Sequence, residues 1–194
     1  RVRFLSGGGT RVAVALPDGS VREYDEYGLA CVETESGQGV AVLSHLGDDL
    51  LILGRDGSAS IRDGEGVERS RVRMGSAALA AQGDGDRAWI LFPRGLVARL
   101  SADGKLGPTI DAGVPDARDL KVFPSRVLVL GPRGVASLSK EGQVFRDLAL
   151  RNAPRLPAAT ASGLVVSAGE DWILYAYRFE RNLGDPPRPL LGAP

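Results

Sequence analysis

Short apolar runs separated by glycine-containing turns recur along the whole chain. Four of these runs cover residues 12–16, 50–53, 89–92 and 127–130. Each is rich in valine, isoleucine and leucine, and a continuous apolar run of this length suits a strand that is buried on both faces. A tight turn and a second run follow each of them, so the pattern predicts a series of β-hairpins.

Turn glycines recur with the same spacing as the apolar runs. One set comprises Gly19, Gly57, Gly95 and Gly134, and a second set comprises Gly28, Gly66, Gly104 and Gly142. The pairs Asp18-Gly19 and Asp56-Gly57 are strong hairpin signals, because glycine adopts the positive φ of a primed turn at little cost. The second set predicts another turn, and then a third strand such as residues 29–33.

Five segments of the chain align without gaps, and they define a repeat of about 38 residues. The aligned segments begin at Val12, Leu50, Ala88, Val127 and Leu164. A further apolar stretch precedes most hairpins, at residues 40–43, 77–81, 120–123 and 158–161. Four strands per period are typical of a propeller blade. A sandwich or barrel also has short strands but does not explain the fixed period.

The predicted fold is therefore an all-β propeller of about five four-stranded blades. The predicted blades cover residues 1–36, 37–75, 76–113, 114–152 and 153–180, and a proline-rich tail covers residues 181–194. The fifth repeat shows only three strands before this tail. We expect an arc of a larger seven- or eight-bladed ring, which would self-associate or need upstream blades. The alternative is a closed five-bladed ring, with residues 1–5 as a latch strand.

Composition narrows the classes of partner. Basic and acidic residues number 24 each, so net charge gives no general attraction to nucleic acid or to acidic membranes. No apolar run approaches the roughly 18 residues of a membrane span, and we expect no membrane insertion. Cys31 is the only cysteine, which excludes an intrachain disulfide.

Candidate catalytic and metal-binding residues are few. His45 is the only histidine, which excludes a two-histidine metal site, and we expect it at a strand end. Asp84 and Asp86 resemble half of a calcium loop but fall short of six oxygen ligands. Glu170 and Asp171 are adjacent in a turn, where side chains diverge. We therefore expect no catalytic residue, no cofactor and no metal.

The predicted inner strands argue against a glycosidase. Five-bladed sugar hydrolases project carboxylates from these strands into a central channel. Residues 40–43, 77–80 and 158–161 are small and almost wholly apolar, and residues 120–123 add only Lys121. The run Gly7-Gly8-Gly9 lacks the Lys-Ser/Thr of a phosphate loop, and a flexible turn is expected there.

The fifth hairpin, SAGEDWILYAYRFE at residues 167–180, resembles the repeat of the quinoprotein-like (PQQ-like) propellers, which reads strand, Gly-x-Asp-Gly turn, Leu-Tyr-Ala-Leu-Asp. The matching residues are Gly169, Asp171, Leu174, Tyr175 and Ala176, with a partial match at Gly54, Asp56 and Gly57. That family includes quinone-dependent dehydrogenases and a lipoprotein that assists outer-membrane protein assembly.

The resemblance implies a propeller of the non-enzymatic, binding branch of this family, in an extracytoplasmic compartment of a bacterium. The dehydrogenases carry tryptophan docking motifs in their outer strands, whereas Trp89 and Trp172 lie elsewhere in the repeat. Their quinone site also uses a calcium cluster and a vicinal disulfide, which Cys31 alone cannot supply. A quinoprotein dehydrogenase remnant and a glycosidase stay as the enzymatic alternatives.

Charged residues are predicted to separate onto the two faces of the propeller. Turns between second and third strands share one face with the inter-blade connectors. That face carries Arg55, Arg94 and Arg133 at matching positions, and the connectors add Arg71, Arg73, Arg118, Arg151 and Arg155. The opposite face carries Asp25, Glu26, Asp48, Asp49, Asp63, Glu65, Asp84, Asp86 and Asp103. We expect a non-catalytic scaffold that binds a protein or an anionic ligand through Arg55, Arg94, Arg133, Arg118 and Arg155.

Overall fold

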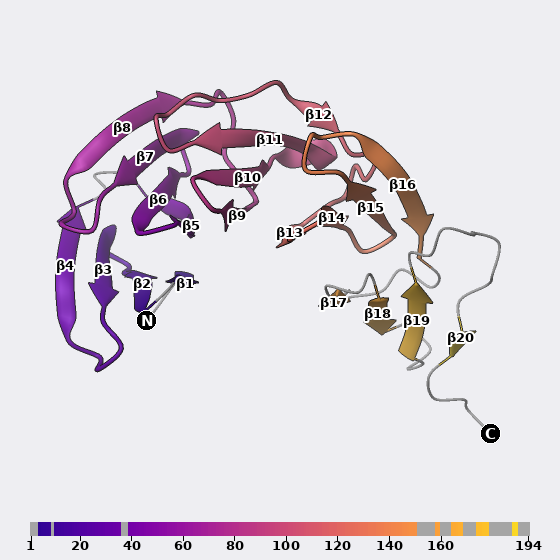
Figure 1. The fold of residues 1–194 in the computed structure, drawn as a ribbon, viewed down its shortest axis with the longest axis horizontal. Helices are drawn as coiled ribbons and strands as arrows, with labels where there is room; N and C mark the ends of the chain where they lie inside the picture. Colours follow the sequence, from indigo (N-terminus) through magenta and orange to yellow (C-terminus); the bar gives the residue numbers. More distant parts are fainter. Residues whose placement is uncertain are drawn as a thin grey trace. The chain divides into compact units, whose positions relative to one another are not determined.

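A computed structural model describes residues 4–8, 10–35, 39–150, 158–159, 164–168, 174–178 and 188–189. These residues form five four-stranded antiparallel sheets and one 3-10 turn, η1 (Pro93–Gly95). Strand order within each sheet follows the chain, and Figure 1 shows the sheets as successive blades. The all-β propeller predicted from the repeat is confirmed.

Each blade begins with its inner strand. Blade 1 comprises β1 (Phe4–Gly8), β2 (Arg11–Ala15), β3 (Ser20–Tyr24) and β4 (Ala30–Glu35). Blade 2 comprises β5 (Val40–Leu46), β6 (Asp49–Gly54), β7 (Ser58–Arg62) and β8 (Glu68–Arg73). Blade 3 comprises β9 (Ala80–Asp84), β10 (Arg87–Leu91), β11 (Leu96–Ser101) and β12 (Ile110–Asp111).

Two further blades complete the described chain. Blade 4 comprises β13 (Asp119–Phe123), β14 (Arg126–Leu130), β15 (Gly134–Leu138) and β16 (Val144–Ala149). Blade 5 comprises β17 (Ala158–Ala159), β18 (Leu164–Ala168), β19 (Leu174–Arg178) and β20 (Arg188–Pro189). The chain divides into two compact units, Arg1–Ile110 with blades 1 to 3 and Asp111–Pro194 with blades 4 and 5.

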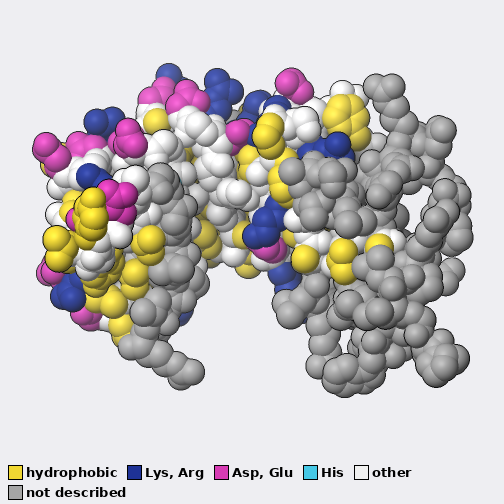
Figure 2. Space-filling view, turned by 60° about the horizontal axis from the view of Figure 1, so that its bottom comes forward, with side chains coloured by type: hydrophobic (Ala, Val, Ile, Leu, Met, Phe, Trp, Pro, Cys, Tyr) yellow, Lys and Arg dark blue, Asp and Glu magenta, His cyan; other side chains and the backbone are white. Residues whose placement is uncertain are grey.

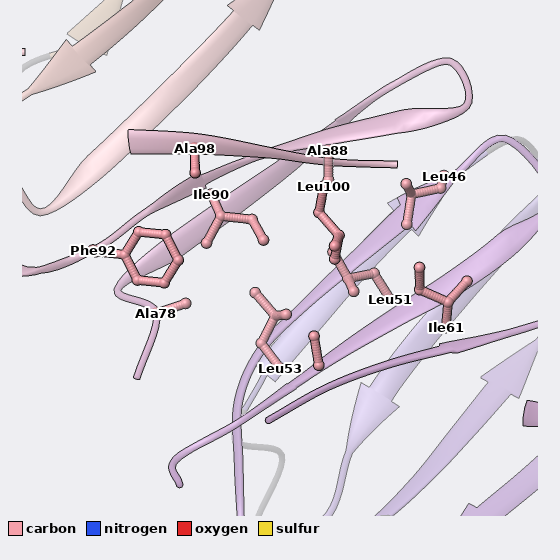
Figure 3. Packing of buried hydrophobic residues seen from close by; sticks show 11 residues of the cluster. Leu46, Leu51, Leu53, Ile61, Ala78, Ala88, Ile90, Phe92, Ala98 and Leu100 are labelled. Carbon is pink, nitrogen blue, oxygen red and sulfur yellow. The ribbon is translucent and has the colours of Figure 1, made fainter. Parts of the chain in front are cut away.

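The core of the first unit lies between its blades. Strands β6 and β10 are buried on both sides, as their unbroken apolar sequences predict. Ile90 and Phe92 of blade 3 pack against Leu51 and Leu53 of blade 2 in one cluster, which Figure 3 shows from close by. Trp89, on the same strand, is 1% exposed. The predicted deep burial of this strand is confirmed.

The first glycine turn is not the primed turn that the Asp-Gly pairs predict. In blade 1 the Leu16 amide donates to the Ser20 carbonyl at 2.8 Å, and the Gly19 amide donates to the Leu16 carbonyl at 3.1 Å. Gly19 has φ 91°, whereas Asp18 does not have a positive φ. The loop is therefore a three-residue hairpin that ends in a glycine bulge.

The corresponding loop of blade 4 is one residue shorter. Leu130 pairs with Val135, whereas Ala15 pairs with Val21 at the equivalent place in blade 1. Gly134 opens strand β15 and lacks a positive φ. Gly134 therefore marks the corresponding β14–β15 turn, as predicted, but it differs from Gly19 in conformation because the shorter loop needs no left-handed residue there.

Two predicted positions near inner strands differ from the structure. The inner strand of blade 3 begins at Ala80 rather than at residue 77, because residues 74–79 are used to cross between blades. Gly7 and Gly8 are not a flexible turn: they pair with Val12 and Arg11 in the blade 1 sheet.

The fifth blade also has a fourth strand, contrary to the prediction. Arg188 and Pro189 pair with Ala176 and Tyr175. The strand is short and lies at the edge of its sheet, where a proline is tolerated. The latch alternative is wrong as well, since Phe4 and Leu5 pair with β2 and the outer side of β19 is taken by β20.

Candidate functional site

The connectors and the β2–β3-type turns share one face of the first unit, here named the connector face. Arg73, the last residue of β8, pairs with Ser58 beside the β6–β7 turn. Residues 74–79 then cross to β9, whose first residue, Ala80, pairs with Leu91 beside the β10–β11 turn. The turns at residues 54–57 and 92–96 therefore lie on the same face, as predicted.

Arg55 and Arg94 are both exposed on the connector face, but they do not hold matching positions. Arg55 is the first residue of its three-residue loop, residues 55–57, whereas Arg94 is the second of residues 93–95. The Arg55 amide donates to the Gly39 carbonyl at 2.9 Å, and its methylene stem lies beside Gly39. A fixed backbone and a packed stem leave the guanidinium as the free end of this side chain.

Arg94 is held in an unusual backbone conformation. With φ 68° it is the only left-handed non-glycine residue in the described part of the chain. A left-handed conformation costs an L-residue on the order of 1–2 kcal/mol. Arg94 stands where the first two blades have Asp18 and Asp56. Sequence inspection could have found this substitution by aligning the three turns.

The two aspartates build their turns through hydrogen bonds. The Asp18 Oδ1 atom accepts from the Ser20 amide at 2.9 Å and from the Ser20 hydroxyl at 2.7 Å. Asp56 accepts from Ser58 in the same way, at 3.0 and 2.7 Å. The Ser20 amide and hydroxyl lower the pKa of Asp18, and the Ser58 hydroxyl and amide lower that of Asp56. The turn of blade 3 has no such acceptor, because Arg94 cannot accept a hydrogen bond.

The second unit presents two of the predicted arginines. Arg133 is exposed on the β14–β15 loop, and its Nε atom donates to the Asp116 carboxylate at 2.8 Å. Arg118 is exposed immediately before β13. Arg151 and Arg155 lie outside the described residues. Arg71 and Arg73 belong to strand β8 and not to a connector, which corrects their predicted placement.

The opposite face of the first unit is not a uniformly acidic surface. Arg69 forms ion pairs with Asp49 at 3.3 Å and with Asp63 at 3.5 Å, and Lys105 pairs with Asp103 at 2.7 Å. Figure 2 shows basic and acidic side chains interleaved along the upper edge of the view. The charge separation predicted from turn positions is therefore reduced by local pairing.

Several of the predicted acidic residues are turn-building groups. The Asp25 Oδ1 atom accepts from the Tyr27 and Leu29 amides at 3.0 and 2.9 Å. Asp63 does the same in blade 2, and the Ser139 hydroxyl in blade 4. The hydrogen bond from the Val67 amide is the main cause of the lowered pKa of Asp63. The sequence contains the signal, since Asp25, Asp63, Ser101 and Ser139 recur at the repeat spacing.

A buried Glu–His pair that was not predicted from the sequence links blades 1 and 2. His45 Nε2 lies 3.3 Å from Glu23 Oε1, with side chains 6% and 2% exposed. His45 is near the end of β5, as expected, but Glu23 was not singled out. The signal available was its place in β3, since Glu23 holds the position that Ile61 holds in β7.

The inner strands carry carboxylates, contrary to the prediction. Strand β9 contains Asp84, and Asp119 opens β13. Asp84 and Asp86 flank Gly85 in the turn between β9 and β10, as predicted. Among the described residues no group of three or more His, Cys, Asp or Glu side chains is placed to hold a metal ion. The described part of the chain also contains no helix that is long and apolar enough to span a membrane.

No family model matches the chain. A stretch of 98 residues, 49% of the chain, is 33% identical to an uncharacterized protein of Treponema pallidum (strain Nichols) and covers 18% of that protein. The chain thus spans only a small part of this relative.

Solved structures of propeller proteins share the fold. The computationally designed Ika8 protein matches 91% of the chain with a TM-score of 0.73 and 18% identity, over 58% of its own length. BamB from Moraxella catarrhalis matches 90% of the chain with a TM-score of 0.67 and 14% identity, over 57% of its own length. Both are propellers. At these identities the likeness establishes the fold alone: this chain is built from β-propeller blades.

Proposed function

We propose that the chain is a non-catalytic binding scaffold whose connector face recognises an acidic segment of a partner protein. The observation that carries the proposal is Arg94. It stands where the two preceding turns have a turn-building aspartate, offers no acceptor to its own turn and adopts a left-handed φ, yet presents an exposed guanidinium. A residue that works against its own turn points to a role outside folding.

Arg55 extends the same surface. It lies in the equivalent loop of the neighbouring blade, and the connector at residues 74–79 passes beside both loops, because the Met74 amide donates to the Gly57 carbonyl and the Leu79 amide donates to the Leu91 carbonyl. Leu79, in this connector, is 45% exposed. Guanidinium groups bind carboxylates through two parallel hydrogen bonds, and a nearby apolar side chain adds contact area. An acidic segment with interspersed apolar residues fits this combination. Arg133 and Arg118 offer the same chemistry in the second unit.

We further propose that the chain belongs to the quinoprotein-like propeller family. It is supported by the repeat residues around Leu174, Tyr175 and Ala176 and by the propeller fold of BamB. Under this assignment the chain belongs to the binding branch of the family.

Charge reversal on the two faces tests the proposal. The double variant Arg55→Glu with Arg94→Glu is compared with Arg69→Glu combined with Arg87→Glu. The control residues are exposed on the opposite face, at 58% and 55% of their side chains, and both double variants change net charge equally. Fluorescence anisotropy measures binding of a fluorescein-labelled polyglutamate peptide at several salt concentrations.

The connector-face variant is expected to weaken peptide binding by about tenfold or more, since charge-assisted hydrogen bonds contribute about 1.5–3 kcal/mol each. The control variant should bind nearly as the wild type does. Equal loss in both variants would reduce the effect to net charge and refute the site. Binding of heparin without binding of the peptide would assign the face to a glycan instead. Turnover in a glycan-hydrolysis or quinone-cofactor screen would contradict the non-catalytic role.

A further inference from the structure

The three blades of the first unit allow one repeat position to be compared in three surroundings. Leu50 and Ile52 of blade 2 pack against Ala13 and Ala15 of blade 1. Ala88 and Ile90 of blade 3 pack in the same manner against blade 2. Alternate residues of each second strand therefore point toward the preceding blade. Val12 and Val14 hold these positions in blade 1.

The backward face of blade 1, here defined by Val12, Arg22 and the turn at residues 27–29, is partly uncovered. Val12 is 37% exposed, whereas its equivalents Leu50 and Ala88 are 2% and 0% exposed. Arg22 is also partly exposed, while Ser60 and Ala98 at the same register are buried. The difference in exposure follows the order of the blades, because only blades 2 and 3 have a preceding blade in this unit.

The glycines in the turns between third and fourth strands show the same difference between blade 1 and the other two blades. A Cβ atom on Gly66 would lie 2.6 Å from the Val32 side chain, on the outer strand of the preceding blade. A Cβ on Gly104 would collide with Ser70, on the outer strand of blade 2. A Cβ on Gly28 would meet nothing within 4 Å. The glycine in the turn between the third and fourth strands is thus a contact point between neighbouring blades, and in blade 1 this contact is not made.

Apolar side chains surround the unused contact point. Tyr27 is 80% exposed and Leu29 is 66% exposed, on either side of Gly28. Figure 2 shows hydrophobic side chains gathered at the left of the view, where Figure 1 places blade 1. Exposed apolar clusters of this kind mark an interaction surface.

We propose that the backward face of blade 1 docks a further four-stranded blade of the same repeat, supplied by the same protein. The outer strand of that blade would cover Gly28, as β4 covers Gly66 and β8 covers Gly104, and its forward face would cover Val12. The interface is the one that the molecule already forms twice in its first unit. The solved propellers that resemble the chain extend well beyond the matched region, which occupies 58% and 57% of their lengths.

Thiol labelling at Val12 tests the docking surface. The variant Val12→Cys is made with Cys31→Ser, so that the new thiol is the only one from residues 1 to 194. Its rate of reaction with a maleimide is measured in the 194-residue chain and in the complete product of the gene. Val67→Cys in the same background is the control, since Val67 is 57% exposed on the corresponding turn of blade 2. Thermal unfolding confirms that each variant is folded.

The expected result is fast labelling of Cys at position 12 in the 194-residue chain and labelling at least about tenfold slower in the complete gene product. The control thiol should react equally in both. Equal reactivity at position 12 in both proteins would overturn the proposal. Protection already present in the 194-residue chain would overturn it too, because the chain would then cover its own face. Protection that disappears on dilution would assign the face to a second copy and likewise overturn it.

Discussion

Ile90→Ala probes the packing between blades 2 and 3. Ile90 is completely buried in the cluster with Leu53 and Phe92. The substitution removes three carbon atoms, which corresponds to about 2.5 kcal/mol of lost transfer free energy. Part of the surrounding wall is formed by Ala78 and Ala98, which have no side-chain rotamers with which to fill a void. A cavity term therefore adds to the loss, and we expect the free energy of unfolding to fall by about 3–5 kcal/mol.

Equilibrium unfolding in urea measures this change. Tryptophan fluorescence reports on Trp89, the neighbour of Ile90, together with Trp172, and far-ultraviolet circular dichroism reports on the sheets. Coincidence of the two curves justifies a two-state fit. Val67→Ala is the control, because Val67 is 57% exposed and should cost less than about 0.5 kcal/mol. A loss below about 1 kcal/mol for Ile90→Ala would show that blades 2 and 3 do not pack through this cluster.

Two further outcomes follow from the polar contacts. Glu23→Ala should lower the free energy of unfolding by about 1–3 kcal/mol, because it removes a buried hydrogen-bonding contact to His45. Glu23→Ile with His45→Leu should recover most of this loss, and wild-type stability of the single variant would show that the pair is dispensable. At Asp103, hydrogen bonds from Lys105 and Ser101 lower the carboxyl pKa from 3.8 to about 2. The stabilisation of the folded state by this carboxylate is present above pH 3.8 and is lost as the pH falls through about 2. Lys105→Met should raise this pKa in an NMR titration, and an unchanged titration would contradict the pairing.

The sequence predicted the blades well because their signals are local and repeated. Buried second strands such as residues 50–53 are continuous apolar runs, and the glycines of the third turn adopt positive φ wherever they recur. The start of β9 was misplaced by three residues, since the alanines of a connector and of an inner strand look alike. The β20 strand was missed because its two residues carry no periodic pattern and one of them is proline.

The candidate site was only partly predictable. Turn positions identified Arg55 and Arg94 and their common face, since strand order alone determines on which face a turn lies. The pairing of charges was not predictable, because Arg69 of β8 contacts Asp49 and Asp63, which belong to two different turns. The position of Glu23 in its strand indicates burial, but its contact with His45 depends on how two blades stack, which the pattern within one blade does not determine.

Arg94→Asp tests most directly whether this arginine is present for binding. The substitution restores the residue that Asp18 and Asp56 provide in the other turns, and it should leave the free energy of unfolding unchanged or raise it by up to about 1 kcal/mol. Binding of the polyglutamate peptide should fall by about tenfold, in line with the loss of a charge-assisted contact. Undiminished binding by this stable variant would contradict the proposed role of the connector face.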